Sequence, residues 1–250
     1  MPLSEPVHFL RRAVGFARVE FAALLALLII GLGVAAFAEL ADDMTEADGQ
    51  NFDLIILSAL RPSANPSDAL GPWWLETAAN DITALGGLSV LALFATVAVA
   101  FLLIQRKRLS AFMLVLGLIG GVMLSEGLKA VFERERPPSA FQAVETINAS
   151  FPSGHALLST VFYLSLAVML ARAFPRRHVK IYVIAVGVTI AVLVGLTRIY
   201  LAAHWATDVF AGWSIGAAWA MALWLVSHAV DRRQRRVHSG LVDETLVVEG

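Results

Sequence analysis

Six runs of mostly apolar residues constrain the fold of this chain more than any other feature. A helix needs about 20 apolar residues to cross the hydrocarbon region of a bilayer. The runs are Phe21–Ala38, Ile82–Ile104, Leu109–Leu128, Ala156–Ala171, Val179–Leu196 and Val209–Val230. Because backbone polar groups find no water in hydrocarbon, such runs form helices rather than open strands. The sequence therefore predicts an all-α integral membrane bundle of six transmembrane helices.

The composition agrees with a membrane protein and excludes several other classes. Charged residues make up 16% of the chain and apolar residues 58%, whereas soluble domains carry about 25% charged residues. The net charge of −1 gives no positive field for nucleic acid, so we expect no nucleic-acid partner. The chain has no cysteine, which excludes disulfides, a thiolate nucleophile and cysteine-based metal sites.

The basic residues are distributed unevenly between the loops that alternate across the six spans. Fourteen of the 19 lie before the first span, in the second and fourth connections, or after the sixth span. The positive-inside rule makes that side cytoplasmic, so both termini are predicted to be cytoplasmic. Five basic residues remain on the outer side and need another explanation: Arg61, Lys129, Arg134, Arg136 and Arg198.

The first outer connection, Glu39–Asp81, is long and opens with acidic residues. Within it, Phe52, Ile55, Ile56 and Leu60 recur at helical spacing and predict a short helix. That helix either lies on the membrane interface or packs on the loop as a solvated helix, and the spacing does not separate the two.

The six spans predict one membrane domain over residues 1–238. Residues 239–250 are polar and acidic without periodicity, which predicts a disordered tail. The tripeptide Ala36-Phe37-Ala38 resembles a signal-peptide cleavage site. The apolar stretch before it is longer than the apolar core of a signal peptide, which has about 7–15 residues. We therefore expect a retained anchor.

A first polar segment follows the third span. Lys129 ends that span, and Arg136-Pro137 follows seven residues later. Arginine offers a planar fork to phosphate oxygens, and lysine offers a point charge. Taken alone, this pair is explained better by a lysine that extends to the membrane surface beside a polar loop.

A second segment, Pro152-Ser153-Gly154-His155, lies directly before the fourth span. Ser153 is a natural N-cap, and Gly154 lets the backbone approach a ligand closely. The N-terminus of a helix presents unpaired N–H groups and a partial positive charge, which favours a bound phosphate. His155 in the first turn can give or take a proton, although an ordinary capped helix also fits the pattern.

A third segment joins the fifth and sixth spans. Arg198 lies at the outer end of the fifth span, where an unpaired charge is costly. His204 and Asp208 are four residues apart and share one face at the start of the sixth helix. An aspartate bonded to one imidazole nitrogen leaves the other nitrogen as a nucleophile or base.

The three segments together resemble the type 2 phosphatidic acid phosphatases, also called lipid phosphate phosphatases. This family shares its site with vanadium haloperoxidases and glucose-6-phosphatase, and its signatures are Lys-x6-Arg-Pro, Pro-Ser-Gly-His and Ser-Arg-x5-His-x3-Asp. The order and spacings match over residues 129–208, which we call the signature core. The one departure is Thr197 in place of the usual serine, and both residues carry a hydroxyl.

The resemblance implies a mechanism with a phosphohistidine intermediate, in which His204 is the nucleophile, Asp208 orients it and His155 is the proton donor. Five residues are then expected to bind the phosphate: Lys129, Arg136, Ser153, Gly154 and Arg198. Because three cations neutralise the transferred group, we expect neither a metal nor another cofactor.

The implied substrate is a membrane lipid that carries a phosphate or diphosphate, hydrolysed at the outer face of the inner (plasma) membrane. We favour undecaprenyl diphosphate, because an outward-facing site on a minimal six-span chain suits an isoprenoid carrier. Phosphatidylglycerophosphate and phosphatidate are alternatives, because the catalytic residues contact only phosphate. A six-span transporter or a lipid-binding protein without turnover would use the same fold. A transporter predicts charges deep within several spans, whereas here they cluster at the outer ends. The sequence gives no oligomeric state.

Overall fold

The computed structural model describes residues 5–44, 46–61, 68–142 and 148–248, and these residues form helices and loops without any strand. Side chains are considered only within residues 20–234 of these ranges. The helices are α1 Glu5–Asp43, α2 Ala47–Ala59, α3 Trp73–Ala84, α4 Leu88–Ile104, α5 Arg108–Phe132, the short 3₁₀ helix η1 Ser139–Phe141, α6 Gly154–Ala173, α7 Arg177–Tyr200 and α8 Ala206–Val248. The all-α prediction is confirmed for this part of the chain.

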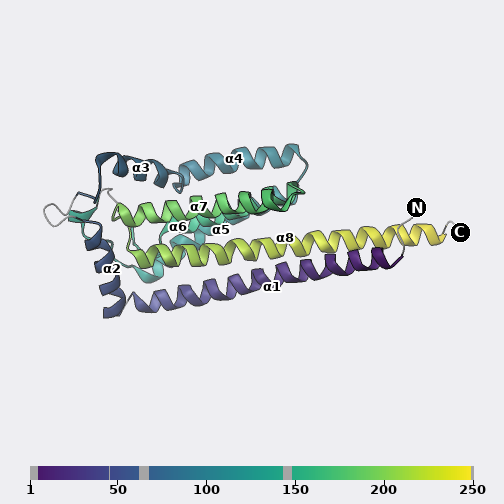
Figure 1. Ribbon diagram of the computed structural model, residues 1–250, viewed down its shortest axis with the longest axis horizontal. Coiled ribbons are helices and arrows are strands. Elements are labelled where there is room, and N and C mark those ends of the chain that lie inside the picture. Colours follow the sequence, from purple (N-terminus) through teal and green to yellow (C-terminus); the bar gives the residue numbers. More distant parts are fainter. Residues whose placement is uncertain (1–4, 45, 62–67, 143–147, 249–250) are drawn as a thin grey trace.

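Helices α1, α4, α5, α6, α7 and α8 run along one axis and form an elongated bundle (Figure 1). The two longest, α1 and α8, are antiparallel neighbours, and the termini lie at the same end of the bundle. At the opposite end, α2 runs across the bundle axis near the turn from α7 to α8. That second end therefore gathers the connections that contain the polar segments.

Five helical segments are long and apolar enough to span a membrane: Glu20–Asp43, Arg108–Phe132, Gly154–Ala173, Arg177–Tyr200 and Ala206–Gln234. A sixth span arises only if α3 and α4 are counted together, and these two helices meet at an angle of 48°. The described residues thus support five or six spans. The cytoplasmic placement of both termini stays a prediction.

The structure differs from the continuous helix predicted over Ile82–Ile104, because the chain breaks at residues 85–87. A Cβ atom at Gly86 would lie 2.4 Å from Val194 Cγ1 and 3.2 Å from the carbonyl oxygen of His155. Only a glycine at this position allows the first turn of α6 and the side chain of Val194 in α7 to approach the backbone this closely. Two turn hydrogen bonds, from the N–H groups of Gly86 and Gly87, cap the end of α3.

The short helix predicted within the first outer connection is confirmed as α2. Its exposed face carries Phe52, Leu54 and Ile55, whereas Asp53 and Leu57 are buried against the bundle. An apolar exposed face is what a helix at the membrane interface requires, and the buried face shows that α2 also packs on the protein.

Helix α8 continues to Val248 and so includes most of the tail for which disorder was predicted. Side chains beyond Gln234 are not described. The division into a domain over residues 1–238 and a disordered tail over 239–250 therefore stays a prediction.

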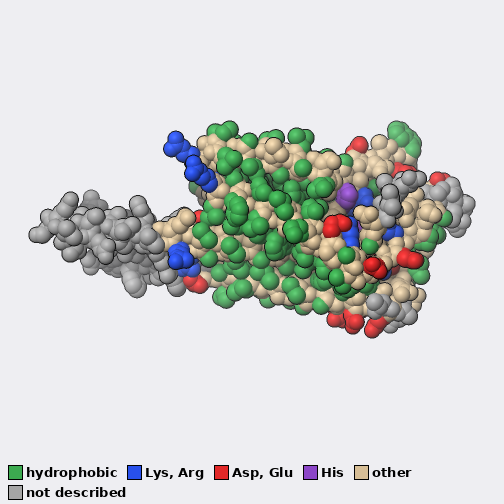
Figure 2. Space-filling model, turned by 180° about the vertical axis from the view of Figure 1, so that it is seen from behind, with side chains coloured by type: hydrophobic (Ala, Val, Ile, Leu, Met, Phe, Trp, Pro, Cys, Tyr) green, Lys and Arg blue, Asp and Glu red, His purple; other side chains and the backbone are tan. Residues whose placement is uncertain are grey.

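Helix α6 is the centre of the bundle. More than half of the residues in its membrane-spanning stretch are buried, against 6% in that of α1. Its residues Leu157, Val161 and Phe162 are almost inaccessible to solvent. The outer helices carry a broad apolar band between two ends where charged side chains gather (Figure 2). An exposed apolar surface of this extent fits a lipid environment.

Close contact between α6 and α8 depends on a glycine. A Cβ at Gly212 would lie 2.7 Å from the carbonyl oxygen of Ser153 and 3.0 Å from Ala156 Cβ. We expect Gly212→Ala to force the helices apart and to lower the free energy of unfolding by about 1–3 kcal/mol. Thermal unfolding in detergent measures this change.

The matched control is Gly127→Ala in α5, where a Cβ meets nothing within 4 Å. This substitution should be neutral or stabilising by up to about 1 kcal/mol, because alanine is the better helix former. Equal unfolding temperatures for the Gly212 variant and the parent would contradict the close-packing argument.

Candidate active site

All three predicted segments converge at the end of the bundle crossed by α2. Lys129 lies in the last turn of α5, and Ser153 is the N-cap of α6. Arg198 lies in the last turn of α7, and Asp208 in the first turn of α8. Residues almost 80 positions apart in sequence thus meet at four helix ends.

A tight turn after α7 brings His204 back beside Arg198. Ala202 has a φ of +50°, in the left-handed region. The N–H groups of Ala203 and His204 both donate to the carbonyl oxygen of Arg198, at 3.0 and 3.3 Å. His204 is consequently held in a buried loop, with 3% of its surface exposed.

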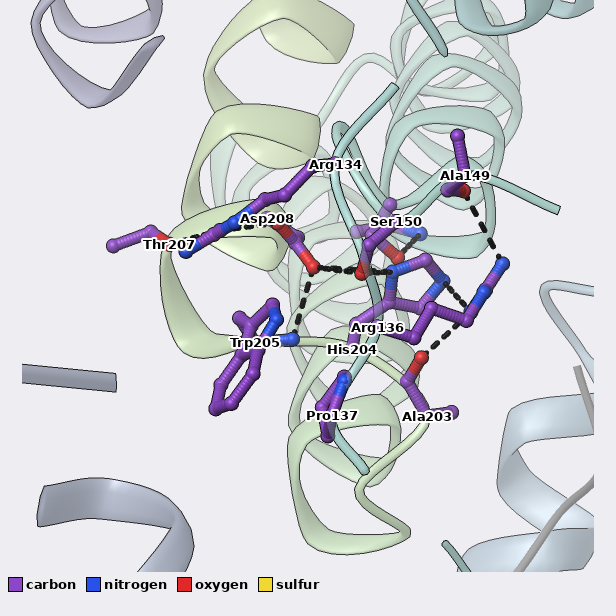
Figure 3. Close-up of polar contacts among 12 residues, drawn as sticks. Arg134, Arg136, Pro137, Ala149, Ser150, Ala203, His204, Trp205, Thr207 and Asp208 are labelled. Carbon is purple, nitrogen blue, oxygen red and sulfur yellow. Dashed lines mark hydrogen bonds and ion pairs between the residues drawn. The ribbon is translucent and has the colours of Figure 1, made fainter. Parts of the chain in front are cut away.

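One side of the His204 ring faces Asp208. Its Nδ1 lies 3.5 Å from Asp208 Oδ2 and 3.4 Å from the hydroxyl of Ser150 (Figure 3). Asp208 Oδ2 also accepts hydrogen bonds from Ser150 Oγ at 2.5 Å and from the Trp205 N–H at 2.9 Å. From this contact we assign the proton of the neutral ring to Nδ1, which leaves the lone pair on Nε2.

Arg136 lies on the other side of the ring. Its Nη1 is 3.1 Å from His204 Nε2 and donates to the Ala203 carbonyl at 2.6 Å. The carbonyls of Asn148 and Ala149 hold the rest of the guanidinium. A group carried on Nε2 would therefore be in contact with Arg136, although protein carbonyls already use most of the guanidinium.

The N-terminus of α6 faces a lysine. A Cβ at Gly154 would lie 3.5 Å from Lys129 Nζ and 3.2 Å from Ser125 Oγ, so the glycine keeps this space open. The side chain of Ser153 accepts from the Ala156 N–H at 3.5 Å, as expected of an N-cap. Lys129 also forms an ion pair with Glu126 at 2.9 Å.

Two buried polar atoms at this end have no hydrogen-bond partner among the described residues. They are Arg198 Nε and Ser125 Oγ. Arg198 is 5% exposed, and its Nη1 donates to Thr83 Oγ1 at 3.3 Å. Because buried polar groups are almost always paired, both atoms fit a site that receives a polar ligand. Ser125 carried no sequence signal, but it lies one helical turn before Lys129.

His155 faces the break between α3 and α4. A Cβ atom added at Gly87 would lie 3.8 Å from His155 Nε2, and a Cβ atom added at Gly86 would lie 3.3 Å from the Cβ atom of His155. The two glycines thus form one wall around the imidazole.

A network that the sequence did not predict supports Asp208 from behind. Arg134 donates to Asp208 Oδ1 at 2.6 Å and to Asp53 Oδ2 at 2.8 Å. Its guanidinium also lies 5.7 Å from the centre of the Trp205 ring. Arg134 was recognised only as an outer cation, and neither Asp53 nor Ser150 lies in a signature.

Burial and the positive charges of Arg136 and Arg198 lower the pKa of His204 to about 4, although Asp208 opposes the shift. The ring is therefore neutral at pH 7, the form in which an imidazole nitrogen can act as a nucleophile or base. We expect the acid limb of kcat/KM to lie clearly below 6.5, about the ordinary pKa of histidine. Because the folded pKa lies below the unfolded value, stability also declines as the pH falls from about 6.5 to 4.

The pH dependence of kcat/KM is measured and corrected for ionisation of the substrate phosphate, which phosphorus NMR follows separately. An acid limb at or above pH 6.5 would contradict the shifted pKa.

Among the described side chains, no group of three or more histidine, aspartate or glutamate residues is placed to hold a metal ion. Independence from metals and other cofactors stays a prediction.

Comparison with known proteins identifies the family. The PAP2 superfamily profile matches residues 110–232, a range that holds all three signatures. Phosphatidylglycerophosphatase B of Bacillus subtilis is 36% identical over 145 residues, covering 57% of this chain and 70% of that protein. The chain belongs to the PAP2 superfamily. The predicted resemblance is confirmed, and this PAP2 protein is a membrane phosphatase.

Two further relatives agree with this family assignment. An undecaprenyl-diphosphatase of Sulfolobus acidocaldarius is 30% identical to the PAP2 protein over 150 residues, covering 55% of this chain and 68% of that protein. The crystal structure of a transmembrane PAP2-type phosphatidylglycerolphosphate phosphatase from B. subtilis superposes with a TM-score of 0.70 at 29% identity. It covers 81% of this chain and 96% of that one. The relatives are named for different lipid substrates.

Proposed function

We propose that this PAP2 phosphatase hydrolyses a lipid-linked phosphate or diphosphate through a phosphohistidine on His204. The observation that carries the proposal is the orientation of His204. Its Nδ1 faces Asp208, and its Nε2 faces the guanidinium of Arg136. A nitrogen lone pair directed at a cation is suited to attack a phosphoryl group held by that cation.

In the first step, the Nε2 lone pair forms a bond to the terminal phosphorus while the bond from that phosphorus to the oxygen of the leaving lipid breaks. That oxygen belongs to the lipid alcohol in a monophosphate and to the lipid monophosphate in a diphosphate. His155 gives its proton to the departing oxygen. Asp208 stabilises the positive charge that develops on His204. Five groups hold the phosphoryl oxygens: Lys129, Arg136, Arg198, the hydroxyl of Ser153 and the N–H of Gly154. The buried Arg198 Nε and Ser125 Oγ gain a partner in this arrangement.

In the second step, water attacks phosphorus and the bond to Nε2 breaks. His155, now neutral, takes the proton of that water, so it ends the cycle as it began. Inorganic phosphate leaves, and His204 regains its lone pair. The three cations compensate the charge of the transferred group in both steps, and they perform the task that metal ions perform in other phosphatases.

For the substrate we propose undecaprenyl diphosphate, because a short six-span chain with an outward-facing site suits a lipid carrier that returns across the membrane. Phosphatidylglycerophosphate is an equally supported alternative, since relatives are named for each substrate. Phosphatidate fits the same phosphate groups.

A panel of lipids tests both the activity and the substrate. Purified protein in mixed micelles is assayed for phosphate release from isoprenoid diphosphates and from glycerophospholipid phosphates, with and without a strong chelator. The proposal expects chelator-resistant release, fastest with undecaprenyl diphosphate. Faster release from phosphatidylglycerophosphate would select the alternative. No release from any lipid, with transport or binding intact in vesicles, would favour a protein without turnover.

The proposal places the site at the outer face of the inner membrane, with both termini inside. A chain without cysteine allows single-cysteine labelling without background. Ser139 is exposed at the end with the site, and Gln105 is exposed in the connection between α4 and α5. An impermeant maleimide should label Ser139→Cys in intact cells, and Gln105→Cys only after permeabilisation. The reverse pattern would contradict the orientation.

A further inference from the structure

Helix α2 contributes a buried carboxylate to the end of the bundle that holds the site. Asp53 is 2% exposed, and it lies outside residues 110–232, which match the family. A buried aspartate is costly unless charged or hydrogen-bonding partners compensate it. Its partners therefore indicate its role.

Asp53 binds the start of α8 through both carboxylate oxygens. Oδ1 accepts from the Thr207 N–H at 3.0 Å, and Oδ2 accepts from the Thr207 hydroxyl at 2.6 Å. The N–H groups in the first turn of a helix have no partner within the helix. Asp53 therefore caps α8 from a different helix, one residue before Asp208.

Asp53 also holds Arg134, which in turn holds Asp208. Nη2 of Arg134 donates to Asp53 Oδ2 at 2.8 Å, and Nη1 donates to Asp208 Oδ1 at 2.6 Å. The side chain of Arg134 is 11% exposed, and both carboxylates are almost fully buried. One planar guanidinium thus bridges two buried anions, an arrangement that fixes the position of each.

The bridge determines which oxygen of Asp208 faces the histidine. Arg134 occupies Oδ1, so Oδ2 remains for His204 Nδ1, the Ser150 hydroxyl and the Trp205 N–H. If Arg134 were released, Asp208 would gain freedom to rotate. The imidazole would then lose the partner that holds its tautomer and orientation.

We infer that Asp53 is a positioning residue for the phosphatase reaction, acting through Arg134 and the start of α8 to hold Asp208 against His204. This inference rests on the proposed function of His204. It also gives a role to α2, which crosses the end of the bundle with Phe52, Leu54 and Ile55 exposed on its other face. The catalytic pair is thereby tied to a helix that presents an apolar face at the membrane surface.

Asp53→Asn tests the inference, because it keeps the shape of the side chain but removes the charge that binds Arg134. We expect kcat to fall about 10- to 100-fold while KM and inhibition by inorganic phosphate stay within about twofold. The residues proposed to bind phosphate are not altered. Asp208 is proposed to orient His204 for catalysis and not to bind phosphate. Asn51→Ala, at an exposed position of α2, is the matched control and should behave as the parent.

A double-mutant cycle distinguishes positioning from a general loss of structure. If Asp53 acts largely through Arg134, the variant with both Asp53→Asn and Arg134→Gln should lose clearly less kcat than the product of the two single losses. Losses that multiply would overturn the inference. So would a parent-like kcat for Asp53→Asn, or a loss of phosphate affinity as large as the loss of kcat.

If Asp53→Asn does not fold, Arg134→Lys takes its place. Lysine keeps the charge but lacks the fork that bridges two carboxylates, so a similar fall in kcat at constant KM is expected. A parent-like kcat in that variant would overturn the inference. The same assay includes His204→Ala. If this variant is active, the proposed function is wrong. If it is inactive while the Asp53 variant keeps the parent activity, only the role of Asp53 is contradicted.

Discussion

Replacing His204 by alanine should lower phosphate release by at least about 10⁴-fold, because the variant lacks the atom that receives the phosphoryl group. KM should change much less, since the residues proposed to bind phosphate remain. The ring of His204 is buried and contacts Asp208, Ser150 and Arg136. The measurement is steady-state hydrolysis by purified protein, with circular dichroism to verify that the variant is folded.

The matched control is His178→Ala, which removes an exposed histidine near the start of α7, at the opposite end of the bundle. It should retain parent activity. A folded His204 variant that retains more than about a tenth of the parent activity would exclude His204 as the nucleophile.

Asp208→Asn should impair both catalysis and stability. An asparagine can present its N–H₂ group to His204 and so favour the wrong tautomer, which costs about 10³- to 10⁴-fold in kcat in enzymes where an aspartate orients a histidine. The substitution also removes one of the two carboxylates bound to Arg134. Breaking a buried ion pair in this way costs about 3–5 kcal/mol. Kinetics and thermal unfolding in detergent measure the two effects.

Asp231→Asn provides a control with an exposed ion pair. Asp231 lies 3.5 Å from Arg172, and both side chains are more than a third exposed. Such pairs contribute about 0–1 kcal/mol, so neither activity nor unfolding should change noticeably. An Asp208 variant as stable as this control would contradict the stabilising role of the buried network.

The sequence predicted that the three signatures meet at one end of the bundle, because each one lies at a helix end whose apolar run is easy to recognise. Lys129, Ser153, Arg198 and Asp208 stand at four such ends. The excess of basic residues on the opposite side also marked the outer cations as unusual. The structure adds that Arg61, outside the signatures, binds the carbonyl of Phe141 and so joins two connections at the same end.

The remaining features depend on contacts that no local pattern reveals. The break at Gly86 exists because Val194 and His155 approach from two other helices. Asp53 lies 81 residues before Arg134. The sequence around Asp53 predicts only a short helix with apolar residues on one face. Ser150 lies outside the Pro-Ser-Gly-His signature, although its hydroxyl bonds Asp208. In each case, tertiary packing decides the role.

The most direct test of the account is to trap the phosphorylated enzyme. A good leaving group, as in a nitrophenyl phosphate labelled in its phosphoryl group, needs little acid to depart. His155→Ala should therefore form the intermediate but hydrolyse it slowly. After a rapid alkaline quench, the account predicts an acid-labile label on His204 that accumulates in the His155 variant and is absent from the His204→Ala variant. Turnover by the parent with no label on His204 in any variant would contradict it.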